Sequence, residues 1–226
     1  MSKTVILIPS RLSATRLPGK PLLKINGISI ISHVVKKAKE ADVADVYVAT
    51  EDKEIVDDVN LNGGKAILTS NQHKTGSDRI FECFEKLDLK NIDFIINLQG
   101  DEPNIDISDL KHLHKLVEIK KPEIGTLGSE IKDKNSLNNE NIVKVITDSR
   151  INNTNFPIAK DFKRKLENLE LNIYHHLGIY AYKPDVLKKI IKLKQTNSEI
   201  KNRLEQLRAM ENGIRINVAL AKVCPI

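Results

Sequence analysis

Three cations lie close together in the segment RLSATRLPGKPLLKING, which spans residues 11–27. Arg11 directly follows the apolar run TVILIP, Arg16 is five residues further on, and Lys20 lies beyond a Pro-Gly turn. The apolar run is typical of a buried strand, so the loop concentrates positive charge at the carboxyl end of that strand. Each cation taken alone is explained as a solvated surface residue. The three together favour binding of a phosphate chain, whose charge they would offset during phosphoryl transfer.

This loop contains neither the GxGxxG pattern of a dinucleotide fold nor the GxxxxGK[ST] pattern of a P-loop. Both patterns bind phosphate mainly through backbone N–H groups at a helix N-terminus. The sequence therefore predicts a site in which side-chain cations hold the phosphates.

A carboxylate pair follows a second apolar run, in the segment NLQGDEPNI at 97–105. Asp101 and Glu102 come after Gly100, a residue type that allows the backbone to approach a ligand closely. A carboxylate at the crevice is suited to Mg²⁺, a hard cation that bridges protein and substrate phosphates. An Asp that caps the next element is an equally good explanation of Asp101 alone. The nearby loop of cations favours the magnesium site.

The segment KTGSDRI, residues 74–80, has two explanations that the residues leave open. Thr75, Gly76 and Ser77 are suited to cap a following helix, with Asp78 in its first turn. Alternatively, the same backbone and side chains contact a base or a ribose.

The histidines and cysteines give little support for zinc or for covalent catalysis. His112 and His114 are two apart on a predicted helix, and the pair at 175–176 is adjacent on a predicted strand, so neither pair shares a face. The two cysteines, Cys83 and Cys224, have no CxxC spacing and no visible activating partner, which fits a reducing compartment.

Short β-rich runs alternate with helical patterns over the first 120 residues, which favours an α/β fold with a doubly wound, mostly parallel sheet. Apolar residues at i, i+3 or i+4 spacing predict helices around 30–38, 80–87 and 110–117. Strands are predicted at 4–8, 45–50, 65–69, 93–98, 124–130, 141–148, 175–182 and 214–221. Ligands of such sheets bind at the carboxyl ends of the strands, where both the cationic loop and QGDEP fall.

The rhythm changes after about residue 124, where the predicted strands follow one another closely and 149–165 has the composition of a polar connection. We expect one domain over 1–226, with a smaller lobe within about 124–182 inserted on the sheet.

Composition narrows the possible partners. The chain has 226 residues, 40% of them apolar, and a formal net charge of +6. That charge allows an anionic ligand, but no basic segment is interleaved with aromatic residues, which disfavours nucleic-acid binding. The longest apolar runs are too short for a membrane span or a signal segment. The sequence therefore predicts a cytoplasmic protein that binds neither membrane nor nucleic acid.

Five segments together resemble the 3-deoxy-manno-octulosonate cytidylyltransferase family. They occur in the family's order and cover almost the whole chain: IPSRLSATRLPGKPL (8–22), TGSDR (75–79), NLQGDEP (97–103), HLGIYAY (176–182) and LEQLR (204–208). RLPGKPL and QGDEP are shared with sugar nucleotidyltransferases in general, whereas HLGIYAY with LEQLR narrows the resemblance to this family.

The resemblance implies a Rossmann-like fold of the nucleotide-diphospho-sugar transferase type, a homodimer, and a Mg²⁺-dependent enzyme. Such an enzyme couples CTP to 3-deoxy-D-manno-octulosonate (Kdo), giving CMP-Kdo and pyrophosphate for lipopolysaccharide biosynthesis. Arg11, Lys20 and Asp101 would be catalytic, and Asp101 would bind the metal. The CTP-binding residues would be Arg11, Arg16, Lys20, Thr75, Gly76, Ser77 and Arg79. Those facing the sugar acid would be Gln99, His176, Glu205 and Gln206.

The sequence departs from the family's pattern at its end. The family continues past the last strand into a Gly-Val-Asp-Thr-Pro segment, whose Asp supplies a second metal contact, and then into a helix, whereas this sequence stops at KVCPI (222–226). Two alternatives are therefore open: a truncated chain that binds CTP with little or no turnover, and a related nucleotidyltransferase that acts on another sugar acid.

Overall fold

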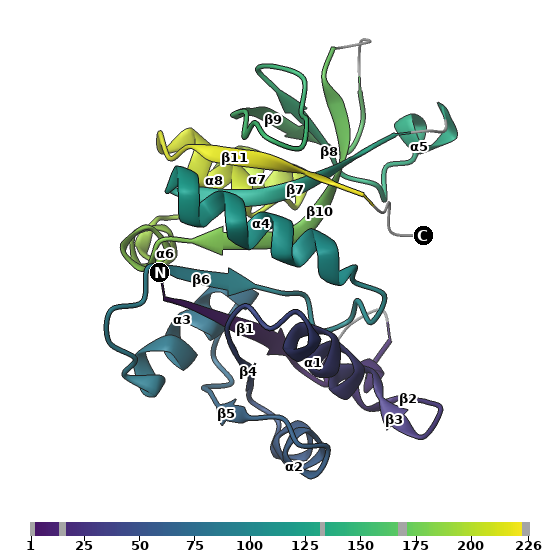
Figure 1. The fold of residues 1–226 in the computed structure, drawn as a ribbon, viewed down its shortest axis with the longest axis vertical. Helices are drawn as coiled ribbons and strands as arrows, with labels where there is room; N and C mark the ends of the chain where they lie inside the picture. Colours follow the sequence, from purple (N-terminus) through teal and green to yellow (C-terminus); the bar gives the residue numbers. More distant parts are fainter. Residues whose placement is uncertain (1–2, 14–16, 132–133, 167–170, 223–226) are drawn as a thin grey trace. The chain divides into compact units, whose positions relative to one another are not determined.

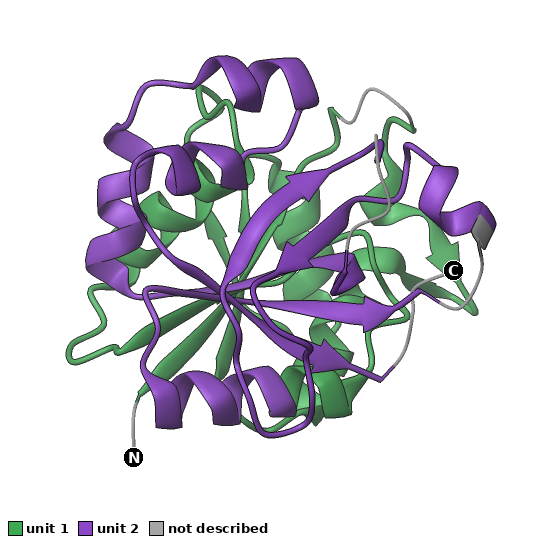
Figure 2. Cartoon of the chain, turned by 90° about the horizontal axis from the view of Figure 1, so that it is seen from above, with its two compact units in different colours: residues 1–111 green, residues 112–226 purple. Residues whose placement is uncertain are grey.

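The computed structural model describes residues 3–13, 17–131, 134–166 and 171–222. The chain divides into two compact units, residues 1–111 and residues 112–226, which Figure 2 draws in different colours. Each unit contains strands, helices and buried apolar residues, and each is described by itself.

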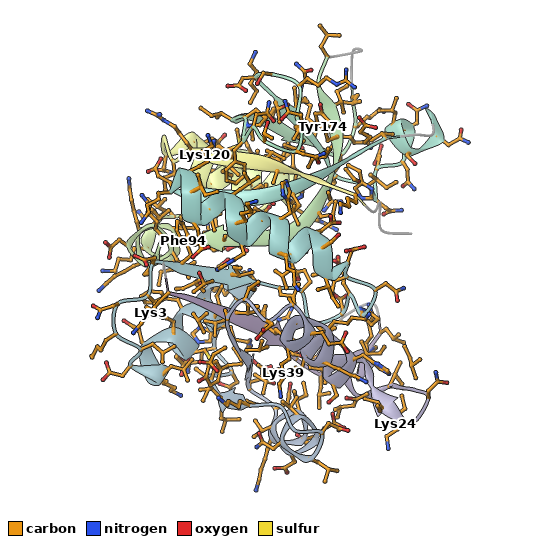
Figure 3. All side chains as sticks on the ribbon, viewed as in Figure 1. Lys3, Lys24, Lys39, Phe94, Lys120 and Tyr174 are labelled. Atoms are coloured by element: carbon orange, nitrogen blue, oxygen red, sulfur yellow. The ribbon has the colours of Figure 1, made fainter. Side chains whose placement is uncertain are left out.

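The sheet of the first unit is parallel throughout, in the order β6-β1-β4-β5. Its strands are β1 (Thr4–Ser10), β4 (Asp45–Thr50), β5 (Ala66–Leu68) and β6 (Phe94–Asn97). Residues 5–8 of β1 and all of β6 are buried, so these strands are covered on both faces, as their apolar runs predict. Phe94, labelled in Figure 3, is only 1% exposed where β6 begins.

Helices cover both faces of this sheet. α1 (Ile30–Glu40) connects β1 to β4, α2 (Lys53–Leu61) connects β4 to β5, and α3 (Gly76–Leu87) returns from β5 to β6 on the other side of β1. Right-handed crossovers in opposite directions place α3 on the face opposite to α1 and α2. Figure 1 shows α1 and α2 with the first unit's strands. The first unit is therefore doubly wound, as the sequence predicts.

A short connection precedes α1. It contains a 3-10 turn, η1 (Lys20–Leu22), and a small hairpin of β2 (Lys24–Ile25) and β3 (Ile28–Ser29). Ser29 caps α1 by accepting a hydrogen bond from the Ser32 N–H. The exposed Lys24 of this hairpin is labelled in Figure 3.

The carboxyl end of β1 is packed from two directions by residues without side chains. A Cβ on Gly100 would lie 2.7 Å from the Pro9 carbonyl oxygen and 3.3 Å from the Ile31 side chain of α1. A Cβ on Gly76, the first residue of α3, would lie 3.3 Å from the Pro9 ring. Pro9 itself falls beyond the ladder with β6, which ends at Leu7, so its missing N–H costs no bond on that side.

The second unit has a mixed sheet in the order β11-β7-β10-β8-β9. Its strands are β7 (Ile124–Glu130), β8 (Lys144–Thr147), β9 (Ala159–Lys163), β10 (Ile173–Tyr182) and β11 (Ile216–Ala221). β11 pairs in parallel with β7, and the pairs of β7 with β10, β10 with β8 and β8 with β9 are antiparallel. The Tyr174 hydroxyl of β10, labelled in Figure 3, accepts a 2.9 Å hydrogen bond from the Ile151 N–H and fixes the segment after β8.

Five further helices lie in the described residues from 107 onward. They are α4 (Ile107–Lys120), α5 (Lys134–Asn138), α6 (Pro184–Lys192), α7 (Asn197–Asn202) and α8 (Gln206–Glu211). The boundary between the units falls within α4. No helix in the described part of the chain is long and apolar enough to cross a membrane.

The predicted α/β class with a mostly parallel sheet is confirmed, and each predicted strand is present within a few residues of its expected bounds. The prediction that 149–165 is only a polar connection is wrong, because β9 lies within it. Within the described residues β9 pairs with β8 alone, and it buries only Ala159 and Phe162, so its sequence lacks the apolar alternation of an interior strand. The single domain with a lobe at about 124–182 stays a prediction.

The packing at Pro9 predicts opposite tolerance at two glycines. Gly100→Ala should lower the free energy of unfolding by about 1–3 kcal/mol, because the new methyl group meets a backbone oxygen that has little room to move. Gly76→Ala is the matched control, because its methyl group meets a proline ring that needs to shift by only a few tenths of an ångström. Urea unfolding of both variants measures the difference, and equal stability of the two would contradict this account.

Candidate nucleotide site

The first unit contains a pocket of about 320 Å³ at the carboxyl ends of its strands. A volume of this size is within the usual range for small-molecule sites. Four separate segments form its wall: the end of β1, the η1 turn, the loop into α3, and the loop after β6. The lining residues are Pro9, Ser10, Arg11, Lys20, Pro21, His73, Lys74, Thr75, Gly76, Arg79, Gln99, Gly100 and Asp101.

Lys20 and Asp101 form an ion pair across the pocket. The Lys20 Nζ donates to Asp101 Oδ2 at 2.9 Å and to the Asp101 carbonyl oxygen at 3.2 Å. The two side chains are 32% and 54% exposed. A pair this accessible to water is worth little to stability, so both groups remain available to a charged ligand.

Two hydrogen bonds hold the cationic loop, one to the rest of the unit and one within the loop. The Leu12 N–H donates to Asp52 Oδ2 at 2.7 Å, just before α2. The Gly19 N–H donates to the Leu12 carbonyl at 2.9 Å and closes the loop on itself. Gly19 has a φ of 72°, a left-handed conformation that favours glycine at this turn. These contacts direct Lys20 back toward the pocket that Arg11 enters from β1.

The N-terminus of α3 opens onto the pocket. Thr75 caps the helix in a reciprocal box: its Oγ1 accepts from the Asp78 N–H at 3.2 Å, and the Asp78 carboxylate accepts from the Thr75 N–H at 3.1 Å. Capping, one of the two explanations left open by the sequence, is therefore confirmed. The partial positive charge of a helix N-terminus adds to the cations around the pocket.

Arg79 lies in the pocket wall, but its guanidinium is already engaged. It is 3% exposed and pairs with Glu51 at the end of β4, while its second nitrogen donates to Thr69 Oγ1 at 2.8 Å and to the Ser70 carbonyl at 3.3 Å. These bonds join β4, the segment after β5 and α3. The contacts that the structure gives Arg79 are those of a residue that positions the wall.

Glu82 of α3 holds the loop that precedes this helix. It accepts the Ser70 N–H at 2.9 Å, pairs with Lys86 at 2.7 Å, and also contacts His73 Nε2. Burial alone would raise the pKa of Glu82, but the hydrogen bonds from Lys86, Ser70 and His73 outweigh it and lower this pKa to about 2. The carboxylate therefore stays charged and keeps His73 at the pocket wall.

Two other titratable groups of this unit have shifted pKa values. Burial, and then the negative charge of Asp101, raise the pKa of Glu102, while Lys20 opposes the shift. Burial raises the pKa of the Cys83 thiol to about 12, which makes this cysteine a poor nucleophile, as the sequence predicts.

The pocket gathers most of the predicted nucleotide-site residues. Arg11, Lys20, Thr75, Gly76 and Arg79 line it with the proposed metal ligand Asp101, and Gln99, which was predicted to face the sugar acid, lines it as well. Ser77 is buried in the first turn of α3 and is not among the lining residues, and Arg16 lies outside the described residues.

Sequence reasoning missed three polar residues of the wall: Ser10, His73 and Lys74. His73 and Lys74 immediately precede the predicted cap at Thr75. Their polar side chains next to a predicted binding segment were the signal from which they could have been predicted as pocket residues. Ser10 was hidden between the apolar strand and Arg11.

The predicted sugar-acid residues other than Gln99 belong to the second unit. His176 of β10 is 8% exposed and is held by its neighbours there. Its ring lies edge-on to Phe162 of β9, with centroids 4.9 Å apart, and 5.3 Å from the Tyr180 ring. Its Nε2 is 3.0 Å from Thr126 Oγ1 of β7.

An irregularity in the β7–β10 ladder fixes the tautomer of His176. The register shifts between Leu177 and Tyr180, and the Thr126 hydroxyl donates to the Ile179 carbonyl at 2.7 Å. Because a hydroxyl has one proton, Thr126 accepts from His176, whose proton is then on Nε2. Burial, with the neighbouring His175, lowers the pKa of His176 to about 3, so the ring is neutral and its Nδ1 is an acceptor.

Glu205 and Gln206 stand at the start of α8, where a buried ion pair positions them. Arg208 donates to both oxygens of Glu199, with its Nε at 2.8 Å and its second nitrogen at 2.5 Å. Glu199 also forms the capping box of α7 with Thr196. The two hydrogen bonds between Arg208 and Glu199 join α8 to α7, and Glu205 lies between these two residues in the sequence.

Comparison with known proteins identifies the family. A family model described as cytidylyltransferase matches residues 5–216. A 3-deoxy-manno-octulosonate cytidylyltransferase of Nitrobacter winogradskyi is 39% identical over 225 residues, covering 99% of this chain and 88% of the relative. One of Rhizobium etli is 37% identical over 227 residues, covering 100% of this chain and 90% of the relative.

This chain belongs to the 3-deoxy-manno-octulosonate cytidylyltransferase family.

A solved structure supports this membership. CMP:2-keto-3-deoxy-manno-octonic acid synthetase complexed with CTP superposes with a TM-score of 0.87 at 38% identity, covering 97% of this chain and 90% of that chain. Apo UDP-glucose pyrophosphorylase, at 16% identity and a TM-score of 0.70 over 97% of this chain and 90% of that chain, shares the fold alone. The predicted resemblance to the cytidylyltransferase family is thus confirmed.

The buried pair of Arg79 predicts a large stability effect. Arg79→Met should lower the free energy of unfolding by about 3 kcal/mol without any nucleotide present, because Glu51 is left charged and unpaired. Lys90→Met is the matched control, since Lys90 pairs with Asp88 at the exposed surface, and it should leave stability unchanged. Urea unfolding measures both. A stability of Arg79→Met equal to that of the parent would show that the pair does not hold the wall.

The depressed pKa of His176 predicts a dependence of stability on pH. Between about pH 3 and pH 6.5 the unfolded chain binds a proton at this residue that the folded chain does not, so stability rises with pH across this window. His176→Gln should reduce the slope of the unfolding free energy against pH by up to the contribution of about one bound proton. Unfolding free energies at several pH values measure it, with His33→Gln as the control at a half-buried histidine of α1. Identical slopes for His176→Gln and the parent would contradict a buried neutral ring.

Proposed function

We propose that this protein is a nucleotidyltransferase that activates Kdo with CTP, giving CMP-Kdo and pyrophosphate. The anomeric hydroxyl oxygen of Kdo bonds to the α-phosphorus, the bond from that phosphorus to the bridging oxygen breaks, and pyrophosphate leaves with the electron pair. The hydroxyl proton is released to water. The observation that carries the proposal is the pocket of the first unit, which joins Arg11, Lys20 and Asp101 to a capped helix N-terminus.

The cations of the pocket would bind and orient the triphosphate. Arg11 and Lys20 line it, and the N-terminus of α3 adds the N–H group of Gly76, since that of Thr75 is donated to Asp78. These groups would also stabilise the charge that develops on the leaving pyrophosphate. Arg16 is proposed as a third cation on the basis of the family resemblance.

Asp101 fits a magnesium site in its chemistry. It presents an oxygen donor that is more than half exposed, and the side chain that pairs with it is a solvent-accessible lysine. Mg²⁺ is commonly held by one or two carboxylates together with substrate phosphates. We propose that Asp101 holds this ion, which would supply Lewis-acid activation and lower the pKa of the attacking hydroxyl. Lys20 would then be released from Asp101 to the phosphates.

On the basis of the family resemblance, Gln99, His176, Glu205 and Gln206 are proposed to contact the sugar acid. A neutral His176 whose proton is on Nε2 offers Nδ1 as an acceptor for a sugar hydroxyl. Gln206 is half-buried at the start of α8, the helix that the pair of Arg208 with Glu199 fastens to α7. A related sugar acid as the substrate remains the alternative, because hydroxyl recognition of this kind is shared among such sugars.

Further proposals rest on the family resemblance. They are that the protein is a cytoplasmic homodimer and that its product is used in lipopolysaccharide biosynthesis.

The function is tested by pyrophosphate release from the purified chain with CTP, Kdo and Mg²⁺, omitting each in turn. Release should require all three. N-acetylneuraminate in place of Kdo tests the alternative substrate, and faster release with it would replace Kdo in the proposal. CTP binding without release under any of these conditions would leave a nucleotide-binding protein in place of an enzyme.

The two partners of the pocket's ion pair should have different roles. Lys20→Ala should weaken CTP binding about tenfold or more, because a charge-assisted contact to phosphate is lost. Asp101→Asn should abolish Mg²⁺-dependent turnover while the fold is retained, because the metal carboxylate is lost and an amide of the same size fills its place. Calorimetric CTP binding and pyrophosphate release separate the two effects. Unchanged affinity in Lys20→Ala, or unchanged turnover in Asp101→Asn, removes that residue from the site.

A further inference from the structure

Ser10 is the last residue of β1. Its hydroxyl is buried, and the described residues show no role for it in holding the fold together. It is 7% exposed, and its Oγ has no hydrogen-bond partner among the residues described. Ser10 also lines the pocket. A buried hydroxyl without a partner is costly, so it is an unusual group to find at the end of a central strand.

Neighbouring hydroxyls differ from Ser10 in being engaged. Thr50, its partner in the β1–β4 register, accepts a 3.1 Å hydrogen bond from the Asp52 N–H through its Oγ1. Thr69 accepts from Arg79 at 2.8 Å. The hydroxyls of Thr50 and Thr69 therefore have hydrogen-bond partners within the protein, whereas the hydroxyl of Ser10 has none among the described residues.

The surroundings of Ser10 favour an uncharged part of the ligand. Pro9 precedes it, Gly76 and Gly100 both approach Pro9, and the guanidinium of Arg79 in this wall is already paired with Glu51. The cations of Arg11 and Lys20 belong to the loop beyond the strand. A phosphate is best placed beside the more exposed cations Arg11 and Lys20, whereas a base or a ribose needs only hydrogen-bond partners.

We propose that the Ser10 hydroxyl binds the nucleoside part of CTP, by a hydrogen bond to an uncharged polar atom of the base or ribose. The proposal rests on the proposed function, because it assumes that CTP fills this pocket. A serine hydroxyl both donates and accepts, and rotation about the Cα–Cβ bond turns it from the protein interior to the pocket. Ligand binding then satisfies a group that the described part of the protein leaves unsatisfied.

The test uses Ser10→Ala and two probes, CTP and inorganic tripolyphosphate, each titrated calorimetrically with Mg²⁺ present. The dissociation constant for CTP should rise about five- to tenfold, the effect of one neutral hydrogen bond, while that for tripolyphosphate should not change. The melting temperature of the ligand-free variant should be unchanged or higher, because an unpartnered hydroxyl has been removed. A residue with a structural role would instead lower it.

Thr4→Val is the matched control. Thr4 begins the same strand and also has an unpartnered, buried hydroxyl oxygen, but it is not among the pocket residues. It should have a similar effect on melting and none on CTP binding. Equal CTP affinity in Ser10→Ala and the parent, an equal loss with tripolyphosphate, or a lowered melting temperature would each overturn the role of Ser10. Absence of CTP binding in the parent would overturn the proposed function together with it.

Discussion

The close approach of two glycines, one in a loop and one at the start of a helix, to Pro9 is the constraint on which the pocket depends. Gly100 brings the loop after β6 against the Pro9 carbonyl, and Gly76 brings the start of α3 against the Pro9 ring. Without these approaches, Asp101 and the capped N-terminus of α3 would stand further from the cationic loop. The geometry of the candidate site is therefore set by backbone packing at the end of one strand, before any charged side chain takes part.

Buried and exposed cations have separate tasks in this chain. Arg79 and Arg208 are nearly inaccessible to water and are saturated by Glu51 and Glu199, so they fix loops and short helices in place. Lys20 is partly exposed and makes a solvent-accessible pair. Planar guanidinium groups suit the first task because they bind several acceptors at once, while a lysine exchanges partners readily. Among these three residues, rigid support is thus provided by the arginines and exchangeable charge by the lysine.

Much of the first unit could be predicted because its signals are local. An apolar run gave β1, and Thr75 with Asp78 gave the start of α3. β9 was missed because edge strands need little apolar alternation. The engagement of Arg79 by Glu51 could not be predicted, since 28 residues separate the two and only the β4–α3 packing brings them together. Ser10 was missed for a similar reason: an unsatisfied hydroxyl is visible only when all its neighbours are known.

The ion pair of Lys20 with Asp101 has a consequence for how ligands enter the site. A ligand that carries one sign of charge must separate the pair and leave the other partner without its counterion. In the proposed reaction the metal and the triphosphate together replace both partners, so each makes the binding of the other more favourable. The two ligands are then thermodynamically coupled through a single contact, and by linkage the coupling is the same in either order of addition.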